Sequence, residues 1–313
     1  MPRNVIIIGS GPAGYTAALY AARADLKPLL LAGEQPGGQL MITTDVENYP
    51  GYPDGVMGPQ MMTDFRKQAE RFGTEVRDET VTRVELKGDT KTVWVGETQY
   101  EARTVIIATG ASAKWIGLES EVTFGGYGVS ACATCDGFFF RGKQVAVVGG
   151  GDTAMEEAHY LTKHVSKVYV IHRRDEFRAS KIMQQRVMSN PKCEIVWNTA
   201  VEEITGVMEP HKKVTGVKLR NTVNGTTREM PLDGVFVAIG HKPNSDLFKG
   251  ALEMDEVGYL KVQPNTTKTM IAGVFACGDV TDPIYRQAVT AAGTGCMAAI
   301  DAEHYLATIP VHA

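Results

Sequence analysis

Near the start of the chain, an apolar run leads directly into a glycine-rich turn, with the sequence Val5-Ile6-Ile7-Ile8-Gly9-Ser10-Gly11-Pro12-Ala13-Gly14. Four consecutive β-branched residues are typical of a parallel strand that is buried on both faces. Helix-favouring residues follow as far as Arg23, and a second apolar run, Leu29-Leu30-Leu31, ends shortly before Glu34. This strand–turn–helix–strand order, with an acidic residue 20 positions after Gly14, predicts a dinucleotide-binding module.

The turn and the acidic residue predict how this first module holds its ligand. Glycines let the backbone approach a pyrophosphate, and the following helix offers free N–H groups and its positive dipole end to the anion. Glu34 accepts hydrogen bonds from free ribose hydroxyls and repels a 2′-phosphate. We therefore expect an adenine dinucleotide without that phosphate. The predicted contacts in the turn are Gly9, Ser10, Gly11, Pro12, Ala13 and Gly14.

The same arrangement recurs in the second half of the chain. The apolar run Val145-Ala146-Val147-Val148 precedes a second glycine turn, a helix is predicted around residues 155–161, and another strand ends at His172. The predicted contacts in this turn are Gly149, Gly151, Asp152, Thr153 and Ala154.

A basic segment follows this second module, beginning 23 residues after Gly149. It contains His172, Arg173, Arg174 and Arg178. Arginine binds phosphate in a bidentate fork, so three guanidiniums and an imidazole here suit the 2′-phosphate of NADP. The alternative is an ordinary solvated basic face. Because of its place after the glycine turn, we interpret the segment as a phosphate clamp.

Further strands and a helical tail indicate how the modules are connected. Residues 105–108 and 235–239 form apolar strands that close each module, and a strand at 273–277 with a helix through Tyr305 should return to the first. We expect an α/β protein with two Rossmann-like domains, the second inserted in the first. Residues 1–114 and 246–313 form one domain, residues 115–245 form the other, and the linkers lie at 111–118 and 241–246. The stretch Gly293-Thr294-Gly295 also fits a glycine pattern, but no strand precedes it, so it predicts close helix packing.

Two nucleotide modules in one chain predict a hydride relay. NADPH in the second module needs an electron acceptor in the same chain, and a flavin is the usual one. We therefore infer FAD in the first module and NADPH in the second.

One close pair of cysteines, Cys132-Ala133-Thr134-Cys135, suggests redox chemistry. Two intervening residues suit a disulfide that forms and breaks reversibly. A zinc site would need a second ligand pair, whereas the other three cysteines are isolated and no histidines cluster, so we predict no metal. The alternative is a pair of unpaired buried thiols. Asp136 follows directly and is placed to exchange a proton with a thiolate, although a plain turn residue before Gly137 is an equal alternative.

Composition limits the possible partners and compartment. The 313 residues are 43% hydrophobic and 22% charged, which is typical of a globular protein. A net charge of −4 gives no overall attraction to nucleic acid or an acidic membrane, and no apolar run approaches the length of a membrane span. Five sparse cysteines are not a secreted disulfide framework, so we expect a reducing, cytoplasmic location.

Taken together, these features resemble the low-molecular-weight thioredoxin reductases over essentially the whole chain. The most specific matches are residues 37–40, 47–51, 130–137, 171–174, 278–280 and 285–288. The resemblance implies a homodimer with thioredoxin as electron acceptor, Cys135 on the flavin side and Cys132 attacking thioredoxin. It also implies further FAD contacts at Gln35, Gly38, Gln39, Asn48, the backbone of Val81, Gly278, Asp279, Arg286, Gln287 and Ala288.

Two alternatives of function stay open beside this resemblance. The chain could reduce another thioredoxin-like protein, or it could be a redox sensor that binds nucleotides without turnover. One departure bears on the partner: the family often has a basic residue between glycines where this chain has Gly126-Tyr127-Gly128. Finally, the dithiol and the nicotinamide must both reach one flavin, so we expect the two domains to rotate between two states about the linkers.

Overall fold

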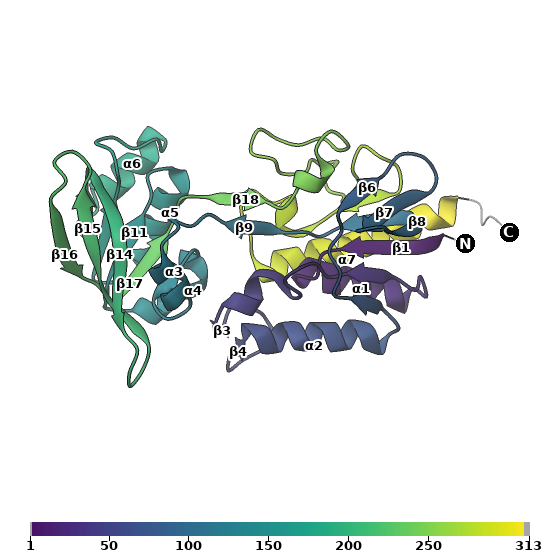
Figure 1. Ribbon diagram of the computed structural model, residues 1–313, viewed down its shortest axis with the longest axis horizontal. Helices are drawn as coiled ribbons and strands as arrows, with labels where there is room; N and C mark the ends of the chain where they lie inside the picture. The colour runs from purple at the N-terminus through teal and green to yellow at the C-terminus, as the bar shows by residue number, and fades with distance from the viewer. Residues whose placement is uncertain (1, 310–313) are drawn as a thin grey trace. The chain divides into compact units, whose positions relative to one another are not determined.

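The computed structural model describes residues 2–309 and divides the chain into two compact units (Figure 1). Unit 1 runs up to Ser112 and resumes at Lys242, and unit 2 comprises Ala113–His241. The chain crosses between them on β9 (Ala111–Ala113) and β18 (His241–Pro243), which pair as a two-stranded sheet.

Unit 1 is built on a sheet of seven strands. The order is β5-β2-β1-β8-β7-β6, and β19 pairs with the second half of β8. The strands β5, β2, β1, β8 and β19 are parallel, whereas β6, β7 and β8 form an antiparallel meander. Their bounds are β1 (Arg3–Ile8), β2 (Leu29–Leu31), β5 (Glu75–Arg77), β6 (Arg83–Glu85), β7 (Lys91–Val95), β8 (Thr98–Ile107) and β19 (Val274–Ala276).

Both faces of this sheet are covered, which explains the continuous apolar runs of its central strands. Val5 and Ile7 pack on one face against α1 (Pro12–Arg23), α2 (Gly58–Arg71) and α7 (Ala288–Thr308). Ile6 and Ile8 pack on the other, against the meander and η3 (Asp246–Phe248). All four side chains are at most 4% exposed.

The helix packing predicted at the third glycine pattern is confirmed at one of its two positions. A β-carbon on Gly295 of α7 would lie 2.2 Å from the carbonyl oxygen of Ala13 on α1, so only glycine allows this approach. Gly293, in contrast, faces open space, because no atom lies within 4 Å of the position of a β-carbon there.

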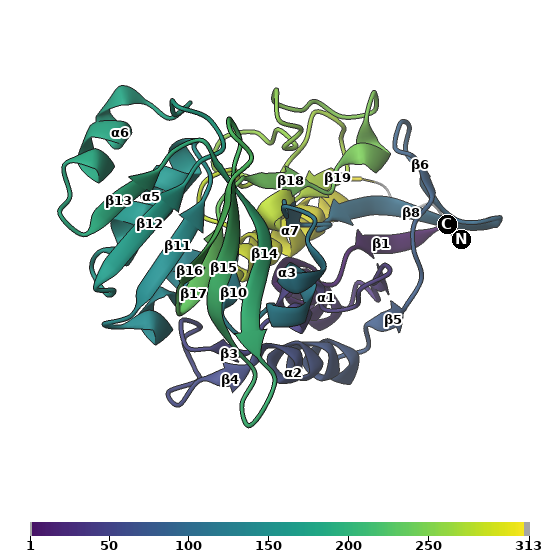
Figure 2. The same cartoon turned by 60° about the vertical axis from the view of Figure 1, so that its left-hand side comes forward.

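Unit 2 has a parallel sheet in the order β10-β17-β11-β12-β13. Helices α5 and α6 pack on one face, and the antiparallel sheet β14-β15-β16 packs on the other, as Figure 2 shows. The bounds are β10 (Val129–Ser130), β11 (Gln144–Val148), α5 (Asp152–Leu161), β12 (Lys167–Ile171), α6 (Lys181–Met188), β13 (Cys193–Val196), β14 (Thr199–Val207), β15 (Lys213–Asn221), β16 (Thr227–Pro231) and β17 (Gly234–Val237).

The predicted fold class is confirmed: each unit has a Rossmann-like parallel sheet, and the second unit is inserted in the first. The antiparallel sheet of unit 2 and the meander of unit 1 were not predicted. The remaining short elements are η1 (Gly38–Ile42), β3 (Asp45–Val46), β4 (Val56–Met57), α3 (Glu119–Phe124), α4 (Ala133–Asp136), η2 (Gly137–Phe140) and η4 (Gly278–Val280).

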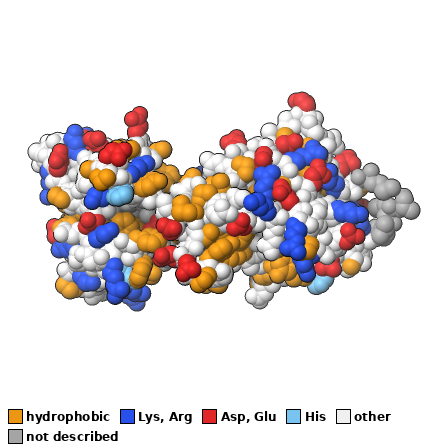
Figure 3. Space-filling model, turned by 90° about the horizontal axis from the view of Figure 1, so that it is seen from below, with side chains coloured by type: hydrophobic (Ala, Val, Ile, Leu, Met, Phe, Trp, Pro, Cys, Tyr) orange, Lys and Arg blue, Asp and Glu red, His pale blue; other side chains and the backbone are white. Residues whose placement is uncertain are grey.

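The surface and the helices carry two further observations. Acidic and basic side chains are intermixed on both units on the face drawn in Figure 3. Within residues 2–309, no helix combines the length and apolar character that a bilayer crossing requires.

Candidate functional site

In each glycine turn, the first glycine packs tightly against a neighbouring strand end, and the glycine just before the helix faces open space. A β-carbon on Gly9 would lie 2.3 Å from the carbonyl oxygen of Ala108, and one on Gly149 would lie 2.4 Å from that of Ala238. Gly11 and Gly151 have no atom within 4 Å of that position. These two open glycines are also the N-cap residues of α1 and α5, and neither helix has a side-chain cap. The free N–H groups at both helix starts suit a pyrophosphate.

Ser10 ties the first turn to the segment that follows β2. Its hydroxyl donates to the carbonyl oxygen of Ala32 at 2.8 Å and accepts the N–H of Gly37 at 3.0 Å. A β-carbon on Gly38 would lie 3.5 Å from the Cα of Gly11, so this segment runs beside the turn. The side chains of Glu34, Gln35 and Gln39 are exposed on the same segment.

Asp279 places a carboxylate next to the first turn. A β-carbon on Gly278 would lie 2.8 Å from the Cβ of Ala13, so η4 contacts the start of α1. Burial raises the pKa of Asp279 to about 6, with nearby Asp282 adding to the shift. Its Oδ1 is buried and has no hydrogen-bond partner among the described residues. A buried acceptor without a donor fits the hydroxyls of a bound ribityl chain, which supports FAD at this position.

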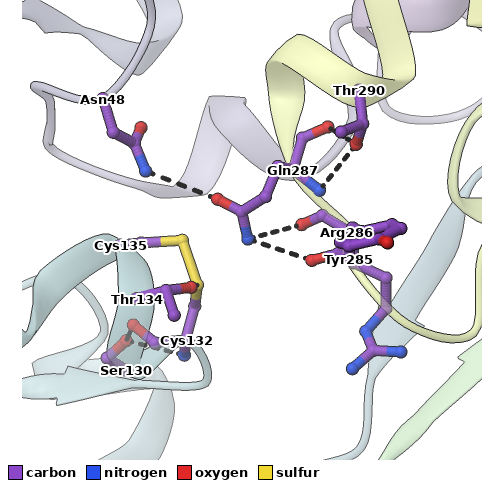
Figure 4. The surroundings of a disulfide bond; sticks show 9 residues. All are labelled: Asn48, Ser130, Cys132, Thr134, Cys135, Tyr285, Arg286, Gln287 and Thr290. Atoms are coloured by element: carbon purple, nitrogen blue, oxygen red, sulfur yellow. Dashed lines mark hydrogen bonds between the residues drawn. A yellow bond between two sulfur atoms is a disulfide. The ribbon is translucent and has the colours of Figure 1, made fainter. Parts of the chain in front are cut away.

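Asn48 and Gln287 join two distant segments of unit 1 (Figure 4). Asn48 Nδ2 donates to Gln287 Oε1 at 3.4 Å, and Gln287 Nε2 donates to the carbonyl oxygens of Tyr285 and Arg286, each at 3.1 Å. Val81 is partly buried on the sheet face opposite α1. The N–H of Gly33 donates to the carbonyl oxygen of Glu79 at 3.0 Å, which brings the segment leading to Val81 beside the end of β2.

Asp282, which precedes Arg286 in the loop before α7, was not predicted from the sequence. The Asp282 carboxylate accepts the backbone N–H groups of Ile284, Tyr285 and Arg286 at 2.8–2.9 Å. It thereby shapes the loop that carries Arg286, Gln287 and Ala288. The Asp-Pro pair at 282–283 is the only local signal of such a turn.

In unit 2, the three predicted arginines are exposed after the end of β12. Arg173, Arg174 and Arg178 form no ion pair with any residue in the described part of the chain. Three guanidiniums without an ion pair in one loop suit a phosphate ligand.

His172 is buried, in contrast to these exposed arginines. It is 7% exposed, and its ring packs against Phe177 and Trp197, at centroid distances of 5.3 and 6.1 Å. Burial lowers the pKa of His172, so the imidazole is neutral near pH 7. Its Nε2 has no hydrogen-bond partner among residues 2–309.

Cys132 and Cys135 form a disulfide, as the predicted redox pair requires. The Cα atoms are 5.3 Å apart, and Cys132 is the N-cap residue of the short helix α4 (Figure 4). The hydroxyl of Ser130 accepts the N–H of Cys132 at 3.0 Å, and Thr134 Oγ1 lies 3.4 Å from Cys132 Sγ. Both cysteines reach the surface, Cys135 more than Cys132.

Burial affects the protonation of the acid after the pair and of two other cysteines. Burial raises the pKa of Asp136, and a hydrogen bond from Ser130 offsets part of this effect. The carboxyl can therefore hold a proton at higher pH than an exposed aspartate. Burial also raises the pKa of Cys193 to about 11 and of Cys277 to about 12, so both stay protonated thiols. No group of three metal-ligating side chains occurs between residues 2 and 309.

The fold and these sites define a protein with two dinucleotide-binding units and a disulfide in the second. Residues 3–295 match the model of the pyridine nucleotide-disulphide oxidoreductase family, and the chain belongs to this family. A thioredoxin reductase of Mycolicibacterium smegmatis is 57% identical over 97% of this chain and 96% of its own length. One of Arabidopsis thaliana, thioredoxin reductase 2, is 53% identical over 98% of this chain and 82% of its own length.

A solved structure shows the same similarity. The thioredoxin reductase of Streptococcus pyogenes superposes with a TM-score of 0.94 at 42% identity, over 98% of this chain and 99% of its own.

Proposed function

We propose that this protein is an NADPH-dependent thioredoxin-disulfide reductase, in which electrons pass from NADPH through FAD and the Cys132/Cys135 pair to thioredoxin. The observation that carries this proposal is the Cys132–Cys135 disulfide, which lies in the same unit as a glycine turn and an arginine loop. Relatives named thioredoxin reductase match almost the whole chain at more than half identity.

The FAD domain of the proposal comprises residues 1–114 and 246–313. Gly9 to Gly14 would hold the pyrophosphate, and Glu34 would accept from the ribose. Asp279 fits the ribityl chain because its buried Oδ1 lacks a donor. The remaining proposed contacts are Gln35, Gly38, Gln39, Asn48, Val81, Gly278, Arg286, Gln287 and Ala288.

The NADPH domain comprises residues 115–245 and carries the dithiol. Gly149, Gly151, Thr153 and Ala154 would line the pyrophosphate site, together with Asp152. Arg173, Arg174 and Arg178, which have no ion pair within the described chain, would bind the 2′-phosphate, and the buried His172 would support their loop.

When bound, FAD supplies the two electrons that open the Cys132–Cys135 disulfide. The Cys132 thiolate then attacks one sulfur of the thioredoxin disulfide, which forms a mixed disulfide and releases the other sulfur as a thiolate. Cys135 attacks Cys132 in turn, so that its own disulfide forms again and thioredoxin leaves with both sulfurs reduced. Asp136, whose pKa is raised by burial, would protonate a departing thiolate.

The proposal includes a cytoplasmic location, a homodimer and a two-state rotation of the domains. Sparse cysteines and two thiols held protonated by burial are consistent with a reducing compartment. For the rotation, the pairing of β9 with β18 supplies a short ribbon at which both chain crossings could bend together. A cross-link that fixes the two domains should leave one half-reaction intact and stop steady turnover.

The central experiment uses the purified protein under anaerobic conditions. A yellow protein that NADPH bleaches, and that oxidises NADPH steadily only when thioredoxin is added, is the expected result. Bleaching without thioredoxin-dependent turnover would point to another thioredoxin-like partner or to a redox sensor. A colourless protein that cannot be reconstituted with FAD would overturn the proposal.

A further inference from the structure

The loop that carries the three arginines, residues 172–180, is fixed by hydrogen bonds at its start. The carbonyl oxygen of His172 accepts the N–H of Thr199 at 3.0 Å, and that of Arg174 accepts the N–H of Asn198 at 3.1 Å. The hydroxyl of Thr222 donates to the carbonyl oxygen of Arg173 at 3.0 Å. The carbonyl groups of residues 172–174 are thus held by Thr199 at the start of β14, by Asn198 just before it and by Thr222 just after the end of β15.

The other end of this loop is tied to the glycine turn. The carbonyl oxygen of Gly150 accepts the N–H groups of Arg178 and Ala179, at 2.8 and 3.2 Å. Asp152 Oδ1 accepts both the N–H and the hydroxyl of Ser180, at 2.9 and 2.8 Å. Asp152 begins α5 and Ser180 is the N-cap residue of α6, so the carboxylate links the first turns of two helices.

The position of Asp152 stabilises its own negative charge, but that charge disfavours the binding of an anionic ligand beside it. Two helix N-termini stabilise its carboxylate. The same carboxylate lies at the start of the helix where a pyrophosphate would bind, and it would repel that ligand. Its Oδ1 is directed at Ser180, which indicates a role in holding the arginine loop.

We propose that Asp152 and Ser180 are positioning residues that set the preference for NADPH over NADH. This inference rests on the proposed function, because it requires NADPH in unit 2. The pyrophosphate and the 2′-phosphate belong to one molecule, so the distance between them varies only within a limited range. The glycine turn and the arginines must therefore be held at a distance that matches it. A loop already fixed in that position loses less conformational entropy when the phosphate binds.

The test measures binding of adenosine 2′,5′-bisphosphate and of 5′-AMP to the FAD-loaded protein by isothermal titration calorimetry. In Asp152→Ala, the Kd of the bisphosphate should rise about 5- to 20-fold, because part of the free energy of the two lost charge-assisted hydrogen bonds is coupled to phosphate binding, while the Kd of 5′-AMP changes less than about 2-fold. Asp152→Asn keeps an acceptor oxygen and should recover most of the affinity. Ser180→Ala keeps the N–H donor and should show a smaller rise in the same direction.

Glu156→Ala is the matched control. Glu156 is another exposed carboxylate on α5, one turn further along, so its removal changes the net charge equally. It should leave both Kd values unchanged. Thermal unfolding of each variant checks that unit 2 stays folded, and steady-state kinetics of Asp152→Ala should show a larger rise in KM for NADPH than for NADH.

The sign of the effect separates the possible roles of Asp152. Tighter bisphosphate binding in Asp152→Ala would mean that its charge only repels the ligand, and equal losses for both ligands would mean that it contacts the shared part of the nucleotide. Either result, or no change, overturns the positioning role. A parent protein that binds the bisphosphate no better than 5′-AMP would instead overturn the NADPH assignment, and the positioning role with it.

Discussion

The imidazole of His172 packs directly against the backbone of Gly150, so closely that a β-carbon on Gly150 would lie 2.2 Å from Cε1 of the ring. The two residues belong to different sequence motifs, one in the glycine turn and one at the start of the arginine loop. Their contact explains why a histidine stands before the arginines: the neutral ring fills the space between the two loops.

Gly150→Ala should therefore destabilise unit 2, because the added methyl group displaces the His172 ring. Overpacking of this kind costs about 1–3 kcal/mol, which a lower midpoint of thermal or urea unfolding would show. Gly151→Ala is the control, since no atom lies within 4 Å of its β-carbon position. That variant should lose less stability than Gly150→Ala, and it should lose affinity for NADPH and NADH alike. Equal stability of the two variants would contradict the packing of His172.

Loss of one charge-assisted contact to the 2′-phosphate should reduce the use of NADPH by about 10- to 150-fold, so Arg173→Ala combined with Arg174→Ala should reduce it by at least that factor. Use of NADH should change little. The measurement is kcat/KM for each nucleotide in the thioredoxin assay. Equal losses with both nucleotides would show that the arginines serve folding or another site.

Cys132→Ser should separate the two half-reactions. Transfer of hydride from NADPH to FAD does not involve this sulfur, so anaerobic bleaching should persist. Thioredoxin reduction should be abolished, since the attacking thiolate is missing. Stopped-flow absorbance and the thioredoxin assay measure the two steps. If the purified wild-type protein held one zinc ion per chain, released by thiol modification, the redox role of the pair would be wrong.

Asp136→Asn should slow thioredoxin reduction by about 10²-fold through loss of a proton donor. Burial raises the pKa of this carboxyl, so it donates a proton below the raised pKa and ceases to as the pH rises through it. The wild-type rate of dithiol oxidation by thioredoxin should fall over that range, and the variant should lack this step. A variant with an unchanged rate and pH profile would make Asp136 a turn residue only.

Asp279 predicts a pH dependence of stability in the FAD-free protein. Its pKa is about 6 in the folded state against an ordinary 3.8, so the folded state binds the proton more tightly. The contribution of Asp279 to stability should be fully present below pH 4, and it should be lost, about 3 kcal/mol in all, as the pH rises through 6. Asp279→Asn should remove this component from unfolding curves measured between pH 4 and 8. Identical slopes for wild type and variant would refute it.

Local sequence was enough to predict both Rossmann-like modules. The runs at residues 5–8 and 145–148 form buried parallel strands, and each leads into a glycine turn that begins a helix. Such features depend on residues close together in the sequence, because periodicity, β-branching and glycine spacing determine the local backbone conformation. The disulfide was predictable for the same reason, because Cys132 and Cys135 are three residues apart. The sheet β14-β15-β16 was missed, since its alternating pattern is interrupted by bulges near residues 201–203 and 205–206.

The burial, protonation and hydrogen-bond partners of individual side chains could be read only from the tertiary structure. His172 reads as one more cation in a basic run, yet contacts with Gly150, Phe177 and Trp197 bury it and keep it neutral. In the sequence, Asp152 is one residue of the glycine turn, yet in the structure its carboxylate accepts a hydrogen bond from Ser180, 28 positions away. Burial, pKa and hydrogen-bond partners depend on which distant segments the sheet brings together. Residue types and spacing therefore determined the modules and their chemistry, while tertiary packing decided which side chains are charged and which are fixed by contacts with distant segments.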